Sequence, residues 1–418
     1  MIASMNGDGS SSGRYPAGAV DYAIQGLFLL IGPALYFAEN AVQILVPLLA
    51  VALAIACRPS WKNELRPFVG RYGVVIAFGA LGVASALWSV DPSRSLMRGA
   101  RLTGEIAIGL GFLAVMQSIG ARRRQDAMGM LALGFIAAVA AVLVSFLWLL
   151  AFGEGMSLAA LHAWSVPFSQ GASIHAILVV PLVLALARRR AFPAAWLFVA
   201  ASLATFALID NNAARGAIVI GAAVGALAYL KAAVRYGAYA LILIATLALP
   251  LLFPVSLGPS LGCTLYRTSP SAAHRLAIWN AVAESIAERP WLGWGLDGSR
   301  ELSQRQATFD LAASCAGDDV PPRPAQRLPR HPHNAVLQVW LELGLVGAGL
   351  AAAIWALIFL RTEATLPGRL ARAGFAGGIA ALVTVLALSY GILQGWLVFS
   401  LFVVAATFMA FLRLEAAR

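Results

Sequence analysis

Charged side chains are scarce in this chain of 418 residues. Asp, Glu, Lys and Arg make up 12% of it, hydrophobic residues make up 60%, and the mean hydropathy is +0.80. About a quarter of the residues in a typical soluble domain are charged. The composition therefore excludes an ordinary soluble globular protein and is typical of a protein that crosses a membrane many times.

The hydrophobic stretches show no alternation of period two, which would mark strands. A helix needs roughly 20 apolar residues to cross the hydrocarbon core, and about twelve stretches approach this length. We therefore predict an all-α polytopic membrane protein with about twelve transmembrane helices. The predicted spans are 21–38, 41–57, 69–88, 99–118, 127–152, 171–187, 193–209, 216–232, 237–254, 345–361, 373–392 and 397–412. Small residues such as Gly221 and Gly225 would let helix backbones approach closely.

Acidic residues are fewer than basic ones, 19 against 30, which gives a net charge of +11. No nucleic-acid-binding motif accompanies this charge, so we do not expect nucleic acid as a partner. Dense basic clusters occur in short loops, for example at Arg122–Arg124 and Arg188–Arg190. With a cytoplasmic N-terminus, every such cluster falls on the cytoplasmic side, as the positive-inside rule requires. We predict that both termini are cytoplasmic.

Features of a signal peptide are missing from residues 1–20, which are polar and rich in Gly and Ser. We expect disordered cytoplasmic tails at 1–20 and 413–418. The first nine spans would occupy 21–254, and a helix start on the outer side followed by the last three spans would occupy 333–412.

Long polar sequence is confined to one segment, 255–332, which we expect to form a large loop with short helices on the outer side. Leu276, Trp279, Ala283 and Ile286 recur at intervals of three and four residues, which predicts an amphipathic helix over 272–289. Pro290 would end it. The Trp- and Gly-rich run 291–295 suits the membrane interface. Residues 316–332 lack periodicity and fit either a mobile flap or a plain linker.

Cysteine is rare, with three residues in the chain. Cys263 and Cys315 both lie in the long loop, whereas Cys57 lies at the cytoplasmic end of the second span. An oxidising outer compartment would favour a Cys263–Cys315 disulfide. Two unpaired buried thiols are the alternative.

Histidine is also rare, yet two of the five histidines lie in the run Arg330-His331-Pro332-His333-Asn334, where the loop meets a membrane helix. Asn334 is a good N-cap for a helix that starts there. The positive end of the helix dipole would favour a neutral His333, which could accept a proton near pH 7. Alternatively, His333 only caps or packs. A metal site formed by His331 and His333, with Asp318 or Asp319 as the third ligand, is the less favoured reading, and we expect no metal.

Some arginines on the predicted outer side have no role in topology. Arg215 lies in the very short outer loop 210–216, and Arg275 lies on the predicted loop helix with Trp279 one turn later. A guanidinium binds phosphate oxygens through two parallel hydrogen bonds, so both could bind an anion. Arg289 and Arg300 compete with Arg275 for this role, and Arg215 could instead reach towards lipid headgroups.

These residues resemble the O-antigen ligase and polymerase superfamily over about 200–350. His333-Asn334 is followed after nine residues by Gly344, with Gly347 nearby. The family's Arg-x-x-x-Trp pattern is similar to Arg275–Trp279, and its Pro-x-x-Gly-x-Gly pattern is similar to Pro290–Gly295. Arg215-Gly216 resembles its short-loop arginine.

The resemblance implies glycosyl transfer from an undecaprenyl-diphosphate-linked glycan (O-antigen) to a sugar hydroxyl of lipid A-core, at the periplasmic face of the bacterial inner membrane. His333 would be the general base, and Arg215 and Arg275 would bind the diphosphate. Arg289, Asn334, His331 and Trp279 would support them. Transfer would invert the anomeric centre and need no nucleotide, metal or other cofactor.

Members of the superfamily with other acceptors remain as alternatives, namely repeat-unit polymerases and protein O-oligosaccharyltransferases. A transporter of lipid-linked glycans is less favoured, because charges in the middle of the spans are nearly absent and no internal repeat is visible.

Overall fold

The computed structural model describes residues 19–56, 61–153, 157–188, 190–305, 308–315, 321–366 and 368–416. The elements outside the long loop are α1 Ala19–Phe37, η1 Glu39–Ala41, α2 Val42–Ala56, α3 Trp61–Ala84, η2 Ser85–Leu87, α4 Pro92–Ser118, α5 Ala121–Phe152, α6 Leu158–Ser165, η3 Val166–Phe168, α7 Ser169–Arg188, α8 Phe192–Leu208, α9 Asn212–Leu230, α10 Ala232–Ala248, η4 Leu249–Leu252, α14 Ala335–Thr365, α15 Arg369–Leu388 and α16 Gly395–Ala416. Those of the loop are α11 Pro259–Thr268, α12 Pro270–Glu288, α13 Gly298–Arg305, β1 Thr308–Asp310, η5 Ala313–Cys315 and β2 Pro324–Gln326.

Each predicted span coincides with a helix. Nine helices in the described ranges are long and apolar enough to cross a membrane, and three shorter apolar helices cover Tyr72–Leu87, Phe192–Leu208 and Gly395–Ala410. The chain is an all-α multi-pass membrane protein, which confirms the predicted fold class.

Some predicted boundaries were wrong. The span expected over 373–392 stops being helical at Leu388, and this early end creates the turn 389–394. The expected tails overlap helices, because α1 begins at Ala19 and α16 continues to Ala416. Residues 1–18 and 417–418 lie outside the described residues.

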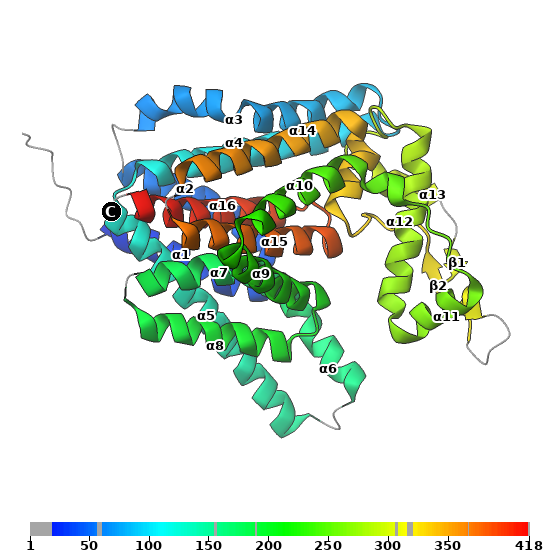
Figure 1. Ribbon diagram of the computed structural model, residues 1–418, viewed down its shortest axis with the longest axis horizontal. Coiled ribbons are helices and arrows are strands. Elements are labelled where there is room, and N and C mark those ends of the chain that lie inside the picture. The colour runs from blue at the N-terminus through cyan, green and yellow to red at the C-terminus, as the bar shows by residue number, and fades with distance from the viewer. Residues whose placement is uncertain are drawn as a thin grey trace, which may run out of the picture.

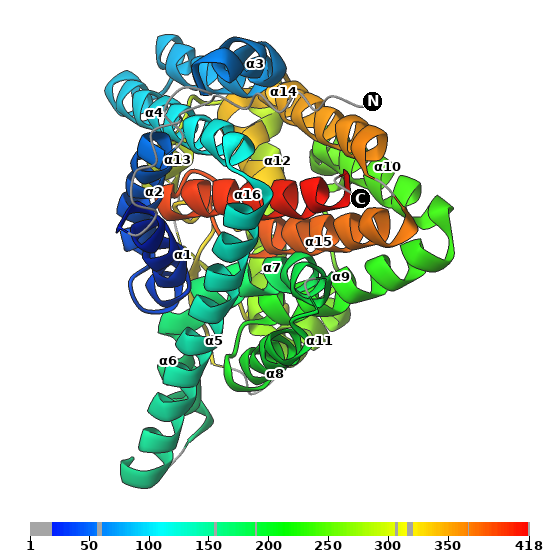
Figure 2. The ribbon, with the colours of Figure 1, turned by 90° about the vertical axis from the view of Figure 1, so that its left-hand side faces the viewer.

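The membrane helices run side by side, with the C-terminal end of α16 at one end of the bundle and α11, α12 and α13 at the other (Figure 1). Seen from the end that holds the C-terminus, α7, α15 and α16 lie in the middle of the bundle (Figure 2). Glycines permit the close crossing of α9 and α15. A Cβ atom on Gly221 would lie 2.9 Å from the Gly377 carbonyl oxygen, and one on Gly377 would lie 2.5 Å from the Gly221 oxygen. The close approach expected at Gly221 is thus present.

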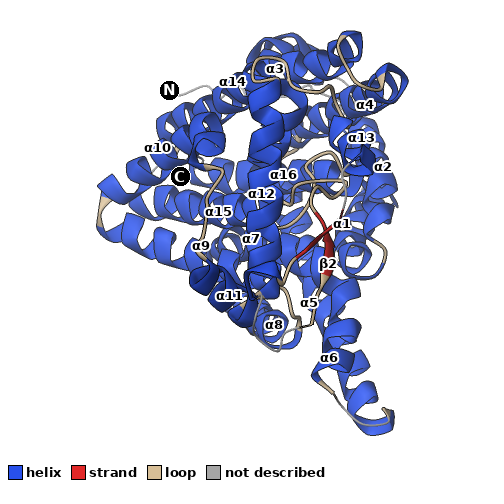
Figure 3. Cartoon of the chain, turned by 90° about the vertical axis from the view of Figure 1, so that its right-hand side faces the viewer, coloured by secondary structure: helices blue, strands red, loops and turns tan. Residues whose placement is uncertain are grey.

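The long loop folds against one end of the bundle, where α12 crosses the ends of the membrane helices (Figure 3). The predicted amphipathic helix is confirmed as α12, whose buried face includes Ile278, Val282 and Ile286. Cys263 of α11 forms a disulfide with Cys315. Strand β2 pairs antiparallel with β1. This pairing was not expected, because residues 316–332 were predicted to be either a mobile flap or a plain linker. Residues 316–320 lie outside the described residues.

A break in α14 joins the loop to the bundle. Gly344 has φ +61° inside the helix, a backbone conformation that favours glycine. The turn after α12 supplies the hydrogen bonds that this break removes from the helix. Leu345 N–H and Val346 N–H donate to the carbonyl oxygens of Pro290 and Trp291 at 2.8 and 3.2 Å.

The same turn also donates to α14. Trp294 N–H and Gly295 N–H donate to the carbonyl oxygens of Leu341 and Glu342, both at 2.9 Å. The run from Pro290 to Gly295 is therefore a backbone clamp that fixes the first turns of α14, and with them the residues just before that helix.

Candidate functional site

His333 immediately precedes the N-cap of α14. The Asn334 side chain accepts a hydrogen bond from Leu337 N–H at 3.1 Å, which confirms the predicted cap. His333 itself has φ +53°, a left-handed conformation that costs a residue with a Cβ atom about 1–2 kcal/mol. Such strain is common at functional sites and persists only where the surrounding contacts hold it.

The contact of His333 with the turn 389–394 selects one tautomer. Its Nδ1 lies 2.6 Å from the carbonyl oxygen of Ser389. Because a carbonyl oxygen only accepts hydrogen bonds, Nδ1 carries the proton and donates it. In the neutral ring Nε2 then holds the lone pair. This is the arrangement that a general base needs.

The charge state of His333 follows from its surroundings. Burial lowers its pKa, the carbonyl of Ser389 raises it, and the positive charge of Arg275 lowers it further. The pKa lies below its ordinary value in the balance of these effects. His333 therefore stays neutral at pH 7, the form in which Nε2 can accept a proton.

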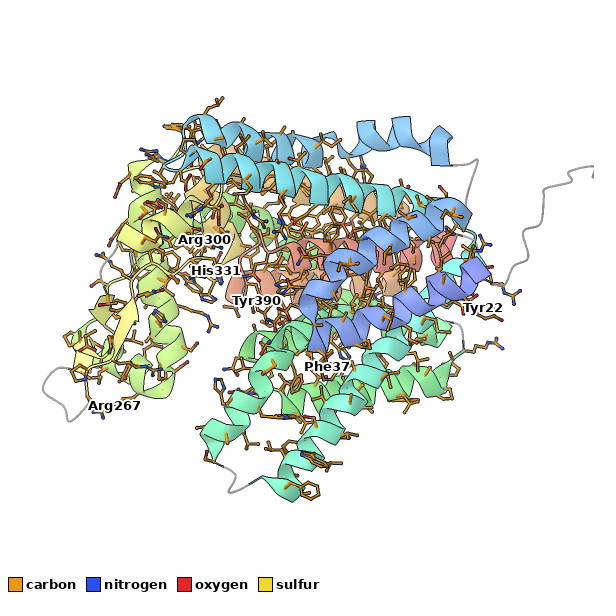
Figure 4. The ribbon with its side chains drawn as sticks, turned by 180° about the vertical axis from the view of Figure 1, so that it is seen from behind. Tyr22, Phe37, Arg267, Arg300, His331 and Tyr390 are labelled. Atoms are coloured by element: carbon orange, nitrogen blue, oxygen red, sulfur yellow. A yellow bond between two sulfur atoms is a disulfide. The ribbon has the colours of Figure 1, made fainter. Side chains whose placement is uncertain are left out.

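His331 packs against His333 and lies where the loop elements meet the membrane helices, close to Tyr390 (Figure 4). The two imidazole rings are 4.4 Å apart, edge to face. Burial lowers the pKa of His331 to about 4. This ring supports its neighbour as a neutral packing group.

Trp279 holds the chain just before His333. Its indole N–H donates to the carbonyl oxygen of Pro332 at 3.0 Å. This bond ties α12 to the segment that carries both histidines, and the supporting role of Trp279 stays a prediction.

Arg275 lies one turn before Trp279 on α12, and its charge acts on His333. Its guanidinium donates to Ser271 Oγ at 3.0 Å and, among the described residues, forms no ion pair with a carboxylate. Burial lowers its pKa, yet a guanidinium remains charged. Arg275 thus places a half-buried positive charge without a counter-charge beside the candidate base.

Arg215 lies at the same end of the bundle, but its surroundings differ from the expected loop. It belongs to the first turn of α9, which Asn211 caps, so the predicted loop position was wrong. Its guanidinium donates to Asp210 at 3.1 Å, to Asn212 at 3.3 Å and to the Phe206 carbonyl at 3.0 Å.

The structure does not bring Arg215 into contact with His333. The described hydrogen bonds link the two regions only indirectly, because Asn211 donates to Ser173 Oγ at 3.0 Å and Ser173 donates to Tyr390 OH at 3.5 Å. Tyr390 follows Ser389, the partner of His333. Any anion that bound the Arg215 guanidinium would therefore have to compete with the carboxylate of Asp210.

The competing arginines have structural contacts. Arg289 stacks 4.1 Å above the Trp294 ring and donates to the Trp88 carbonyl at 3.3 Å, so it braces the clamp turn. Arg300 pairs with Asp297 at 3.5 Å. Neither arginine is among the groups that shift the pKa of His333, whereas Arg275 is.

Two buried polar residues on α14 were missed by the sequence analysis. Glu342 is 1% exposed. Its carboxylate accepts hydrogen bonds from Ser299 Oγ at 2.8 Å, Gln338 Nε2 at 3.0 Å and Asp297 N–H at 2.7 Å. The signal was available: a Glu one helical turn after a Gln, within an apolar span, is rare unless it is used.

Gln338 extends this network to the turn that contacts His333. Its Oε1 accepts from Ile392 N–H at 3.0 Å. Gly391 fits closely beside it, because a Cβ there would lie 3.0 Å from His331 Cβ and 3.2 Å from Gln338 Oε1. Gln338 and Glu342 therefore hold the turn 389–394 against the loop.

A second polar cluster was also missed, between α2, α4 and the start of α16. Arg101 donates to Glu105 at 2.8 Å and to Gln43 Oε1 at 2.6 Å. The predicted span over 99–118 treated this part of α4 as apolar. The sequence gives a signal in Arg98, Arg101 and Glu105, which recur at three and four residues on one helix face.

The described residues give no support to the alternative of a metal site. No group of three or more His, Cys, Asp or Glu side chains within the described ranges is arranged to hold a metal ion. Asp318 and Asp319, the acidic residues considered with His331, lie outside those ranges.

Residues 157–352 match a family model described as O-antigen ligase. Among curated proteins, the chain is 31% identical over 205 residues to a protein named "Putative polysaccharide ligase" from Rickettsia typhi, a match that covers 47% of this chain and 43% of the relative. A protein of the same name from Rickettsia prowazekii is 32% identical over 206 residues, with the same two shares. One from Rickettsia conorii is 44% identical over 80 residues, which are 19% of this chain and 18% of that protein. The chain therefore spans less than half the length of these relatives.

Proposed function

We propose that the chain belongs to the O-antigen ligase superfamily, whose family model matches residues 157–352, and that it is a polyprenyl-diphosphate-dependent glycosyltransferase of the O-antigen ligase type. The donor is a glycan linked to undecaprenyl diphosphate, and the acceptor is a sugar hydroxyl of lipid A-core. The protein lies in the bacterial inner membrane with cytoplasmic termini, and transfer occurs at the periplasmic face. The observation that carries the proposal is the tautomer of His333, which leaves Nε2 free to accept a proton beside a charged Arg275.

The reaction is a single displacement. Nε2 of His333 takes the proton of the acceptor hydroxyl as the hydroxyl oxygen bonds to the anomeric carbon. The bond between that carbon and the diphosphate oxygen breaks, its electron pair stays on the diphosphate, and the configuration inverts. The products are the glycosylated acceptor and undecaprenyl diphosphate, and the proton on His333 is then lost to water.

The charges around His333 suit this step. Burial and Arg275 disfavour the imidazolium in the free protein, but the diphosphate gathers negative charge as the bond breaks. The negative charge on the diphosphate stabilises the imidazolium of His333. Arg275 stabilises that negative charge in turn, and Arg215 does so as well once phosphate oxygens replace Asp210 as its partner. The leaving group is already activated, so neither a nucleotide nor a metal is required.

The test is transfer of a labelled undecaprenyl-diphosphate-linked glycan to purified lipid A-core in detergent with a chelator present. We expect His333→Ala to lower the rate by about 10²–10⁴-fold, the usual contribution of a general base. The control is Leu261→Ala, which removes an exposed side chain from α11 in the long loop. An unchanged rate in His333→Ala would refute the assignment.

The acceptor is tested separately by offering a second lipid-linked glycan or a Ser/Thr peptide. Transfer to lipid A-core alone supports the ligase. Transfer only to a lipid-linked glycan would replace it with a repeat-unit polymerase, and transfer only to peptide with a protein O-oligosaccharyltransferase.

A further inference from the structure

A basic cavity lies at the end of the bundle opposite His333. It has a volume of about 440 Å³ and is formed by the end of α9 and the starts of α10 and α15. Its lining includes Ala228, Leu230, Ala232, Arg235, Arg369 and Arg372. These helix ends face the same side as the C-terminal end of α16 (Figure 2), so the proposed glycosyl transfer leaves the cavity without a role.

The cavity carries more positive than negative charge. One carboxylate, that of Glu363, lies 2.8 Å from Arg235 Nε and 4.0 Å from Arg372 Nε. It neutralises one of the three guanidiniums, and Arg369 contacts main-chain carbonyls instead. Two positive charges are left in excess, which favours an anionic ligand.

Arg369 and Arg372 each use only some of their guanidinium nitrogens in hydrogen bonds to the protein, which leaves the other nitrogens for a ligand. Arg369 donates through Nε and Nη2 to the carbonyls of Tyr229 and Leu230. Arg372 donates through Nε to the Leu366 carbonyl at 3.0 Å. Within the described ranges, Nη1 of Arg369 and both Nη atoms of Arg372 have no hydrogen-bond acceptor. Arginines oriented in this way suit phosphate oxygens.

Apolar side chains border the cavity. Leu230 is 65% exposed, Leu370 46% and Tyr229 44%. In a membrane protein such residues face lipid chains, so the cavity lies where a headgroup meets acyl chains. Basic pockets between membrane helices bind anionic headgroups for this reason.

We propose that the cavity formed by α9, α10 and α15 binds the phosphate of an anionic phospholipid headgroup, with Arg369 and Arg372 as its ligands. The lipid's acyl chains lie along Leu230 and Leu370. The bound phosphate links α9 to α15, the two helices that cross closely at Gly221 and Gly377.

The test measures binding of phosphatidylglycerol to the detergent-purified full chain by native mass spectrometry, with phosphatidylcholine and inorganic phosphate as comparison ligands. We expect saturable binding of phosphatidylglycerol, weakened about tenfold in Arg372→Gln, as for loss of one charge-assisted hydrogen bond. Arg372→Lys keeps the charge and should retain part of the affinity. The control is Arg122→Gln, which removes an exposed arginine from the start of α5, outside the cavity.

Three outcomes overturn the proposal. Equal weakening by Arg122→Gln and Arg372→Gln would show attraction to net charge without a site. Inorganic phosphate that binds as tightly as phosphatidylglycerol would show a site for free phosphate in place of a lipid. If Arg372→Gln does not purify as a folded protein, the comparison of Arg372→Lys with the wild type decides. Unchanged affinity in that variant means that the guanidinium is no ligand.

Discussion

Replacement of Gly344 by alanine should separate the long loop from α14. Alanine at φ +61° costs about 1–2 kcal/mol in the left-handed region. A Cβ there would also lie 2.4 Å from the carbonyl carbon of Trp291, so the clamp turn has to move. Four backbone hydrogen bonds join that turn to α14, each worth about 1 kcal/mol. Their full loss together with the backbone strain destabilises this junction by about 5–6 kcal/mol.

The measurement is thermal stability of the purified protein together with glycan transfer. We expect Gly344→Ala to lower the melting temperature strongly, or to abolish transfer in the fraction that still folds, because the clamp fixes the residues before α14. Gly349→Ala is the matched control on the same helix, since a Cβ there meets no atom within 4 Å. That change should be neutral or slightly stabilising. Equal behaviour of the two variants would refute the clamp.

Three further predictions concern the loop and the candidate site. Cys263 and Cys315 close a loop with a sequence separation of 52, and loss of this disulfide should cost about 2–4 kcal/mol of stability. Alkylation without reductant followed by intact-mass analysis should reveal one free thiol. Three free thiols would exclude the bond. Transfer should be retained at pH 6.5 and fall only at lower pH, because the active form of His333 is neutral and its pKa is lowered. Arg275→Gln should move this loss of activity to higher pH, because it removes a positive charge that lowers the pKa of His333. An unchanged pH profile would show that the charge of Arg275 does not act on His333. For the diphosphate, Arg215→Lys should already impair transfer, and Arg215→Ala and Arg275→Ala should each weaken binding of an undecaprenyl-diphosphate analogue. The double variant should lose less than the sum of the two, whereas strict additivity would assign the arginines to separate sites.

Hydrophobic length alone was enough to predict the architecture, because apolar stretches near the bilayer thickness have few alternatives to a helix. The loop helix over 272–289 and the cap at Asn334 were also predictable, since both follow from local sequence patterns. The hairpin of β1 and β2 was not. Its strands have three residues each and are separated in the chain, so pairing depends on where the loop folds.

The candidate site was only partly predictable for a related reason. The place of His333 at a helix start can be read from the sequence, but its tautomer depends on Ser389, which the predicted span 373–392 placed inside a helix. Similarly, Asp210 precedes Arg215 by five residues, yet only the cap of α9 at Asn211 brings the two side chains together.

The network around Gln338 and Glu342 links the segment that carries the proposed base to distant parts of the chain. Glu342 receives hydrogen bonds from the α13 region, and Gln338 passes the connection to Ile392 in the turn that fixes His333. A buried carboxylate in an apolar span is costly unless it is fully hydrogen-bonded. Here its donors are Asp297, Ser299 and Gln338, and the Gln338 amide also accepts from Ile392 N–H in the turn that contacts His333. The acidic residue therefore couples the fold of the loop to the geometry of the proposed base.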